Sequence, residues 1–312
     1  MKPTLLVLIP LRDDARAAIA AQFDLIHAPD EASRAQAVAE HGAKVEAVLT
    51  NGSTGLTEDE LARLPGLVFL NALGAGYENL PVAAARRRGI AIAHGVGAND
   101  DCVADHAFAL LLATVRGVVR LDAACRAGVW RDALPMQPNF SGKRIGIVGL
   151  GRIGAKIARR AAAFDLDIGY HNRRPREGAE FRYFPAVVEL ARWADYLVVA
   201  TPGGADTRHL IDAAVLAALG ARGFLVNVSR GSVVDTAALA AALRDGRIAG
   251  AGLDVYEGEP EPPAELVGLD SVVLTPHVAG TSPEARDRTI ELFLENAARH
   301  FAGQPLLTPL QA

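Results

Sequence analysis

The residues with the clearest chemical meaning form a glycine-rich turn that follows an apolar run. Arg144–Val148 predicts a buried strand, and the next six residues have the spacing G-x-G-x-x-G before a helical pattern begins. In such a turn the first glycine permits the tight bend, the second lets the backbone approach a pyrophosphate, and the third lets helix and strand pack closely. The sequence therefore predicts a dinucleotide-binding site in which the phosphates face the free N–H groups at the start of the helix. A turn with a purely structural role is the alternative. The residues of the turn are Gly149, Leu150, Gly151, Arg152, Ile153 and Gly154.

The segment after the second strand of this region indicates which dinucleotide is bound. A site that prefers NAD usually has Asp or Glu here, about 20 residues after the turn, to hold the ribose 2′-hydroxyl. This chain has Asn172, Arg173 and Arg174 instead. Guanidinium groups suit a 2′-phosphate through charge-assisted hydrogen bonds, so we expect NADP, with NADPH preferred and NAD as the other cofactor. The alternative is a solvated pair of surface arginines.

Further polar residues follow other predicted strands. Arg230 comes shortly after Phe224–Val228, and His277 comes shortly after Val272–Leu274. Because ligands of open α/β sheets bind outside the carboxyl ends of the strands, we expect both side chains at one edge. A histidine can act as a general acid near neutral pH, and an adjacent carboxylate, for which Glu259 is the candidate, would favour its protonated form. Arg230 could bind the carboxylate of an α-keto acid or polarise its carbonyl, although each residue alone could equally be a loop or salt-bridge residue.

One long apolar stretch must be buried on more than one face. Cys102–Val119 is predicted as a single helix, with Asp100 and Asp101 near its positive end, and we expect it between domains or against another subunit. His106 on this helix is expected to be structural. The histidines other than His277 form no cluster with metal-ligand spacing, so no metal is expected.

The elements that must position these residues are short apolar runs that alternate with Ala- and Leu-rich helical stretches. This alternation favours parallel sheets covered by helices, which is an α/β fold. The predicted strands are Leu5–Ile9, Val45–Thr50, Leu67–Asn71, Ile90–Ala93, Arg144–Val148, Leu166–Tyr170, Tyr196–Ala200, Phe224–Val228, Ile248–Leu253 and Val272–Leu274. The clearest predicted helices are Asp13–Gln22, Gly154–Phe164, Ala213–Leu219 and Thr236–Arg244. Ser282 and Pro283 suit the start of a final helix that reaches about Phe301.

Length and composition narrow the class of protein. A chain of 312 residues with 50% hydrophobic and 22% charged residues indicates a globular protein of two domains. The net charge of −4 gives no electrostatic reason to expect nucleic acid or an anionic membrane as a partner. Two cysteines, Cys102 and Cys125, provide no disulfide framework and suggest a reducing compartment. With no apolar run at the N-terminus long enough for a signal peptide or a membrane span, a cytoplasmic location is expected.

Taken together, these motifs resemble the D-isomer-specific 2-hydroxyacid dehydrogenase family over essentially the whole chain. Within that family, the chain is most similar to glyoxylate/hydroxypyruvate reductases and hydroxyphenylpyruvate reductases. The matching stretches are Asn71–Leu80, Gly149–Gly154, Asn227–Gly231, Gly252–Pro260 and Pro276–Gly280. Their order and spacing make the resemblance highly specific.

The resemblance implies two doubly wound parallel-sheet domains, a Rossmann dinucleotide domain (residues 99–282) inserted into a flavodoxin-like substrate domain (residues 1–98 and 283–312). It also implies a homodimer with the Cys102–Val119 helix in the interface. By the same resemblance, Arg230 binds substrate, His277 donates the proton and Glu259 pairs with it. The substrate carboxylate would be received by the backbone of Leu73, Gly74, Ala75 and Gly76. The expected cofactor contacts beyond the turn and Asn172–Arg174 are Thr201, Pro202, Val228, Ser229, Asp254, which would orient the nicotinamide carboxamide, and Gly280.

The function expected from the resemblance is NADPH-dependent reduction of a small 2-keto acid. An NAD-dependent phosphoglycerate- or lactate-type dehydrogenase is the alternative within enzymes. Formate dehydrogenases of the same superfamily lack the Glu partner, so Glu259 argues against that activity. A nucleotide-sensing protein similar to transcriptional corepressors is the alternative outside enzymes, but nothing here resembles the disordered tails of those proteins. Pocket size, and with it the preferred keto acid, would depend on Leu49–Gly52, Trp130 and Met136.

Overall fold

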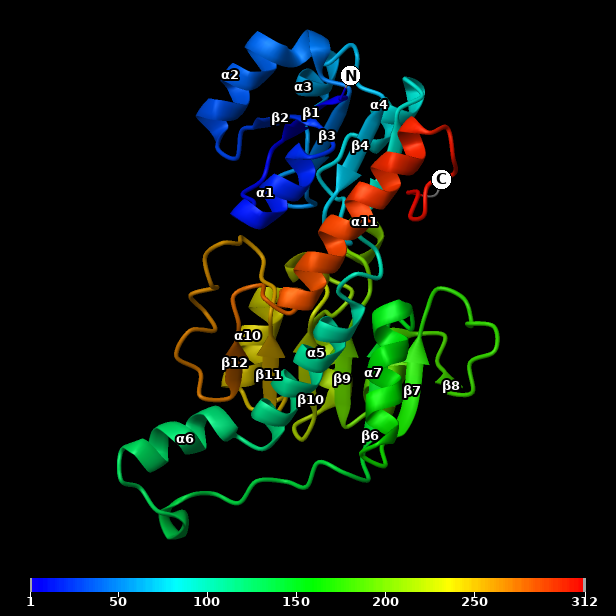
Figure 1. Ribbon diagram of the computed structural model, residues 1–312. Helices are drawn as coiled ribbons and strands as arrows, with labels where there is room; N and C mark the ends of the chain where they lie inside the picture. Colours follow the sequence, from blue (N-terminus) through cyan, green and yellow to red (C-terminus); the bar gives the residue numbers. More distant parts are fainter. Residues whose placement is uncertain (1, 311–312) are drawn as a thin grey trace. The chain divides into compact units, whose positions relative to one another are not determined.

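The strands of residues 2–310, which the computed structural model describes, form two separate parallel sheets of five and seven strands. Each sheet belongs to its own unit: unit 1 consists of Met1–Asn99 and Thr281–Ala312, and unit 2 consists of Asp100–Gly280. The boundaries expected from the sequence fall after residue 98 and before residue 283. The predicted fold class, two doubly wound α/β sheets, is confirmed (Figure 1).

Unit 1 has the strand order β2-β1-β3-β4-β5, which is the flavodoxin-like order. Its strands are β1 (Thr4–Val7), β2 (Asp24–His27), β3 (Ala47–Thr50), β4 (Phe69–Ala72) and β5 (Ala91–His94). Its helices are α1 (Asp13–Ala20), α2 (Glu31–His41), α3 (Glu58–Ala62), α4 (Val82–Arg87) and α11 (Pro283–Phe301). The helix α11 begins as expected from the sequence, because the Ser282 side chain accepts a hydrogen bond from the N–H of Ala285.

The core of unit 1 follows from the alternation of side chains along its strands. Successive residues of a strand point to opposite faces of the sheet. Leu6 and Val48 therefore pack on one face with residues of α2, α3 and α4. Leu5 and Ala47 pack on the other face with residues of α1 and α11. A helix from the far end of the chain thus completes the core of the first sheet.

Unit 2 has the strand order β12-β11-β10-β9-β6-β7-β8. Its strands are β6 (Arg144–Val148), β7 (Asp167–His171), β8 (Arg182–Tyr183), β9 (Tyr196–Val199), β10 (Phe224–Asn227), β11 (Gly250–Leu253) and β12 (Val272–Leu274). Its helices are α5 (Asp100–Val115), α6 (Val118–Arg126), α7 (Arg152–Ala162), α8 (Val187–Trp193), α9 (Ala213–Leu219) and α10 (Thr236–Arg244). The order reverses between β6 and β9, and this switch point is where open α/β sheets bind ligands.

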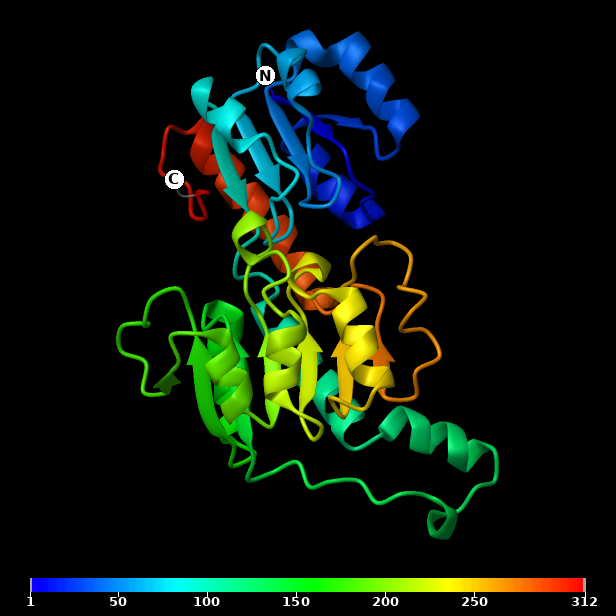
Figure 2. The ribbon, with the colours of Figure 1, turned by 180° about the vertical axis from the view of Figure 1, so that it is seen from behind.

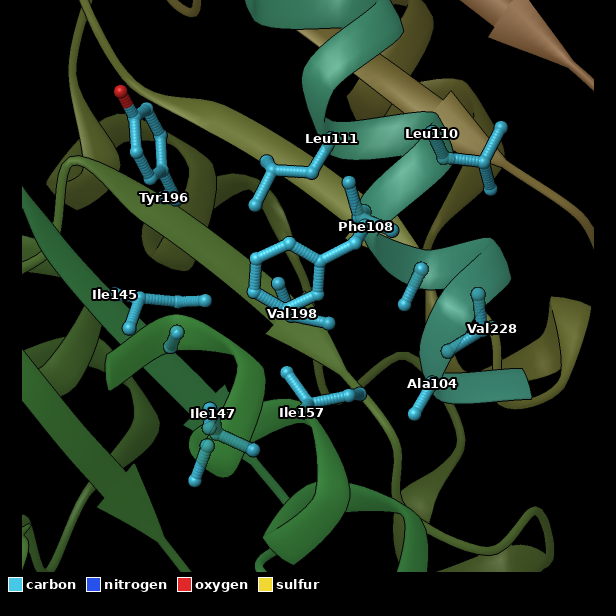
Figure 3. Close-up of a cluster of buried hydrophobic side chains, with 14 of the residues drawn as sticks. Ala104, Phe108, Leu110, Leu111, Ile145, Ile147, Ile157, Tyr196, Val198 and Val228 are labelled. Atoms are coloured by element: carbon cyan, nitrogen blue, oxygen red, sulfur yellow. The ribbon is translucent and has the colours of Figure 1, made fainter. Parts of the chain in front are cut away.

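The two faces of the second sheet also separate by alternation. Tyr196 and Val198 of β9 face α5 and α7, whereas Leu197 and Val199 face α8, α9 and α10. Figure 3 shows Phe108 and Leu111 of α5 directed into the cluster that contains Val198. The sheet is therefore buried on both faces, as a parallel sheet requires.

The prediction of one continuous helix over Cys102–Val119 is wrong. The helix α5 ends at Val115, and Gly117, with φ of +61°, adopts the left-handed conformation from which α6 begins. The apolar side chains of α5 are buried in unit 2 itself, against α7 and the sheet, so they do not need another subunit. Among residues 2–310 no single helix is long and apolar enough to cross a membrane; α5 and α6 pass that test only as a pair bent by 59°.

Beyond α5 the chain leaves the body of its unit. The helix α6 has no buried residue, and with the segment that follows it stands away from the sheet of unit 2 (Figures 1 and 2). This arm, residues 117–142, returns to the core of unit 2 at the buried Phe140, but it exposes Val118 by 53%, Val119 by 57%, Trp130 by 69% and Met136 by 99%. It is the part of unit 2 with the most exposed apolar side chains.

Candidate active site

The glycine-rich turn has the geometry that its three glycines predict. Gly149 has φ of +100°, and a Cβ there would lie 2.8 Å from the carbonyl oxygen of Ala200. A Cβ on Gly154 would lie 2.1 Å from the carbonyl oxygen of Gly149, so helix and turn can pack only without a side chain. Gly151, in contrast, has nothing within 4 Å of the Cβ position, which leaves the backbone accessible there.

The turn also supplies hydrogen-bond donors for an anion. The helix α7 begins at Arg152, and no side chain caps its N-terminus, because the N-cap residue is Gly151. The N–H groups of Arg152 and Ile153 have no acceptor among residues 2–310. Free N–H groups at the positive end of a helix bind phosphate, so these residues fit the pyrophosphate of a nicotinamide dinucleotide.

The loop after β7 is joined to this turn by side-chain hydrogen bonds. Asn172 accepts from the N–H of Leu150 through its Oδ1 at 2.7 Å. Arg176, which the sequence analysis did not single out, donates through Nη1 to the carbonyl oxygens of Leu150 and Gly151, both at 3.1 Å. A residue that binds backbone carbonyls leaves no sequence motif, and only its basic character four residues after Asn172 could have suggested it. Arg176 and Asn172 thus fix the shape of the turn.

The two arginines predicted to bind a 2′-phosphate are much less constrained. The Arg173 side chain is 90% exposed, and its Nη1 lies 3.8 Å from Asp206, which is itself 85% exposed. Arg174 is also exposed. Exposed ion pairs of this kind contribute little to stability, so Arg173 is available to a ligand.

The candidate proton donor is paired with a carboxylate. Nδ1 of His277 lies 2.6 Å from Oε2 of Glu259, and Oε1 of Glu259 accepts from the N–H of Tyr256 at 2.9 Å. His277 has φ of +52°, a left-handed conformation that is unusual for a residue with a side chain. Because Glu259 occupies Nδ1, the other ring nitrogen, Nε2, is the one available to a substrate.

The charges of the pair shift both pKa values in directions that favour an ion pair. The hydrogen bond to Glu259 raises the pKa of His277 above its usual value, outweighing burial and the nearby charge of Arg230, which lower it. Burial alone would raise the pKa of Glu259, but the hydrogen bonds from His277 and Tyr256 outweigh it and hold that pKa below its usual value. The imidazolium form is therefore stabilised.

Asp254 holds the turn that carries His277. It is 1% exposed, and its carboxylate accepts from the N–H groups of Val278 and Ala279 at 2.9 and 2.8 Å. Its backbone carbonyl accepts from the N–H of His277 at 2.8 Å. Three hydrogen bonds to one residue thus stabilise the left-handed turn. The role expected for Asp254 toward the nicotinamide stays a prediction.

His106, which the sequence analysis expects to be structural, belongs to the same hydrogen-bond network as Asp254. Thr275 donates its hydroxyl hydrogen to Asp254 at 2.6 Å. Nε2 of His106 lies 2.9 Å from that hydroxyl oxygen, so His106 must be the donor. His106 therefore donates, through Thr275, toward the buried carboxylate that holds the turn of His277.

Arg230 lies next to the loop that carries Glu259. A Cβ on Gly231 would lie 1.9 Å from the carbonyl carbon of Tyr256, so the two loops approach as closely as backbone allows. The Arg230 side chain packs across Gly203, where a Cβ would lie 2.7 Å from its Cγ. Its guanidinium donates to the carbonyl oxygen of Ser229 at 2.7 Å. Unit 2 thus brings Arg230, Glu259 and His277 together.

The remaining predicted cofactor contacts lie at strand ends of unit 2 or in the loops between them. Thr201 and Pro202 follow β9, Val228 and Ser229 follow β10, and Gly280 is the last residue of unit 2. Ser229 is buried and donates its hydroxyl hydrogen to Asn227 at 2.7 Å. Their contacts with a cofactor stay predictions. Residues 2–310 contain no group of three or more His, Cys, Asp or Glu side chains that could hold a metal ion.

The predicted carboxylate loop, Leu73–Gly76, follows β4 in unit 1. The N–H of Leu73 donates to the carbonyl of Thr50 at 2.7 Å, but those of Gly74, Ala75 and Gly76 have no acceptor among the described residues. Consecutive free N–H groups form a concave site for an anion. The loop is therefore suited to a carboxylate.

Comparison with known proteins agrees with this geometry. A model of the NAD-binding domain of D-isomer specific 2-hydroxyacid dehydrogenases matches residues 108–279. The chain is 37% identical over 306 residues to glyoxylate/hydroxypyruvate reductase A of Arabidopsis thaliana, covering 98% of both chains. It is 40% identical over 267 residues to hydroxyphenylpyruvate reductase of Plectranthus scutellarioides, covering 85% of both chains.

A solved structure of a glyoxylate/hydroxypyruvate reductase is also similar to this chain. The NADPH-dependent glyoxylate/hydroxypyruvate reductase of Sinorhizobium meliloti, in complex with NADP and malonate, is similar with a TM-score of 0.92 and 37% sequence identity. The match covers 99% of this chain and 97% of that one.

Proposed function

Because the chain belongs to the D-isomer-specific 2-hydroxyacid dehydrogenase family of NAD(P)-dependent enzymes, we propose that it reduces glyoxylate and hydroxypyruvate with NADPH. The product would be the D-2-hydroxy acid from hydroxypyruvate and the achiral 2-hydroxy acid from glyoxylate. The observation that carries this proposal is the 2.6 Å hydrogen bond between His277 and Glu259 beside Arg230, at the edge of a dinucleotide-binding sheet. The relatives named above, which are reductases of glyoxylate, hydroxypyruvate and hydroxyphenylpyruvate, support the substrate class.

Each residue of the site has a chemical task in this reaction. Glu259 stabilises the protonated form of His277, whose Nε2 donates a proton to the substrate oxygen. Arg230 stabilises the negative charge that develops on the substrate oxygen. In unit 1, the free N–H groups of Ala75 and Gly76 bind a substrate carboxylate. The dinucleotide, when bound, supplies the hydride for the carbonyl carbon.

The preference for NADPH is supported by Asn172, which stands in place of an acid directly after β7. An Asp or Glu at the position of Asn172 would accept from the ribose hydroxyls and would repel a 2′-phosphate. Arg173 and Arg174 instead place two positive charges beside that position, and the structure leaves both exposed.

A substrate and cofactor panel tests the proposal. Consumption of NADPH and NADH is followed with glyoxylate, hydroxypyruvate, pyruvate, hydroxyphenylpyruvate and 3-phosphohydroxypyruvate. We expect the largest kcat/KM for NADPH with glyoxylate or hydroxypyruvate and a smaller value with pyruvate. A clearly larger value for 3-phosphohydroxypyruvate with NADH would instead establish the phosphoglycerate-type alternative.

We also propose that the protein is a homodimer. The apolar side chains of α5 are buried within unit 2, so we expect the interface at the arm, residues 117–142, instead. The exposed Val119, Trp130 and Met136 of the arm favour contact with a second copy. Light scattering after size-exclusion chromatography should give the mass of two chains. The double substitution of Val119→Asp and Trp130→Glu should give one chain, and a wild-type monomer would disprove the proposal.

A further inference from the structure

The carboxylate loop of unit 1 is held from one side by the end of β5. The N–H of Gly95 donates to the carbonyl oxygen of Gly74 at 2.8 Å. Nδ1 of His94 lies 2.9 Å from the carbonyl oxygen of Ala75. Because a carbonyl oxygen only accepts, Nδ1 of His94 carries the hydrogen and donates it. The carbonyls of Gly74 and Ala75 are thus both directed toward β5.

The planarity of the peptide bond converts this contact into a direction for the N–H groups. In a trans peptide the C=O of one residue and the N–H of the next point in opposite directions. With the carbonyl of Ala75 fixed toward His94, the N–H of Gly76 must point away from β5. By the same argument, the hydrogen bond from Gly95 directs the N–H of Ala75 away from β5. These are two of the N–H groups that have no acceptor among residues 2–310.

His94 is well suited to hold this loop because its own position is fixed by other contacts. Its backbone carbonyl accepts from the Thr308 hydroxyl at 2.7 Å, and its N–H donates to the Thr308 carbonyl at 3.2 Å. Thr308 is held in turn by Asn296 of α11, which is fully buried. The ring of Tyr77, at the far end of the loop, packs edge-on against the His94 ring at 5.5 Å.

We propose that His94 is a positioning residue for substrate: by holding the Ala75 carbonyl, it orients the Ala75–Gly76 peptide so that its N–H receives the substrate carboxylate. This inference rests on the proposed function for the identity of the anion. It assigns a task to a residue of unit 1 that does not donate a proton to the substrate and does not contact the glycine-rich turn.

Three substitutions test the proposal. His94→Leu removes the donor, whereas His94→Asn keeps a side-chain N–H at about the position of Nδ1. His27→Leu is the matched control, because His27 also lies at a strand end of the first sheet and bonds a carbonyl, that of Ile9 at 3.1 Å. Binding of oxalate to the NADPH complex is measured by calorimetry, and KM for glyoxylate, KM for NADPH and kcat are measured with each variant.

We expect His94→Leu to raise the Kd for oxalate and the KM for glyoxylate about five- to tenfold, which corresponds to the loss of one hydrogen bond. KM for NADPH should stay within about twofold, and His94→Asn should recover most of the loss, as a merely structural role would not. Unchanged oxalate binding in His94→Leu, or an equal rise in KM for NADPH, would overturn the proposal. So would a wild-type protein that does not bind oxalate. If the wild type binds oxalate but reduces no keto acid, the proposed function fails, and the oxalate titrations still decide the role of His94.

Discussion

The pairing of His277 with Glu259 makes a sharp prediction for Glu259→Gln. Reduction of a keto acid needs His277 protonated, and the hydrogen bond to Glu259 raises the pKa of His277. In the wild type, kcat/KM is therefore retained below that pKa and falls as the pH rises through it. Loss of the carboxylate lowers the pKa of His277 relative to the wild type, so the fall begins at a lower pH.

The size of the effect follows from the contact. Charge-assisted hydrogen bonds contribute about 1.5–3 kcal/mol and neutral ones about 0.5–1.5 kcal/mol, so an amide in place of the carboxylate removes about 1 kcal/mol. We take this low figure because the two side chains are 39% and 30% exposed and solvent weakens their interaction. At a pH above both pKa values, kcat/KM should thus be about fivefold lower than in the wild type.

The assay is the pH profile of kcat/KM for glyoxylate at saturating NADPH, measured for the wild type, Glu259→Gln and Glu257→Gln. Glu257 is the control because it lies in the same loop but accepts hydrogen bonds from His209 and Thr236 rather than from His277. Its substitution should leave the profile in place. If kcat/KM of Glu259→Gln falls at the same pH as kcat/KM of the wild type, the reasoning is refuted, because the carboxylate then does not act on His277.

Three further predictions follow from the described contacts. His277→Gln should lower kcat by about 10²–10⁴-fold while the Kd for NADPH, measured by fluorescence titration, is kept; a loss below tenfold would exclude His277 as the proton donor. Arg176→Ala should raise the KM for both NADH and NADPH, because Arg176 holds the carbonyls of the glycine-rich turn, whereas Arg173→Ala should raise only that for NADPH. Equal effects of the two substitutions on both cofactors would remove the distinction. Phe108→Ala should lower the free energy of unfolding by about 3–5 kcal/mol in urea titrations, since Phe108 is buried against Phe140 and Phe164; a loss below about 1 kcal/mol would contradict its place in the core.

The buried strands could be predicted from the sequence, because a strand covered on both faces is a continuous apolar run. The two strands that the sequence analysis missed lie at sheet edges. The strand β2 contains Asp24 and His27 and has no fully buried residue, and β8 has only two residues, Arg182 and Tyr183. Edge strands are paired on one side only and need not be apolar. The edge strands β5 and β12 contain apolar runs and were predicted, whereas β2 and β8 have no such run to reveal them.

The residues of the site could be predicted where a chemical task requires a particular residue type, as for Gly149, Gly154 and His277. Their partners were harder to find. His94 and Arg176 act by donating to backbone carbonyls, and which carbonyl lies in reach depends on how a loop is folded. The error at Gly117 has a similar cause, since an apolar pattern does not reveal where a glycine turns a helix.

The return of the chain to its first sheet has a consequence for synthesis on the ribosome. The strands β1–β5 leave the ribosome early, but α11, which covers one face of their sheet, follows only after residues 95–282. At about 5–20 residues per second, that interval is on the order of 10–40 s. Throughout it, the face that contains Leu5 and Phe69 is covered only by α1, and unit 2 is complete in sequence before α11 is made. The nascent chain thus passes through a stage in which its later unit can fold before its earlier one, with an apolar sheet face open to chaperones.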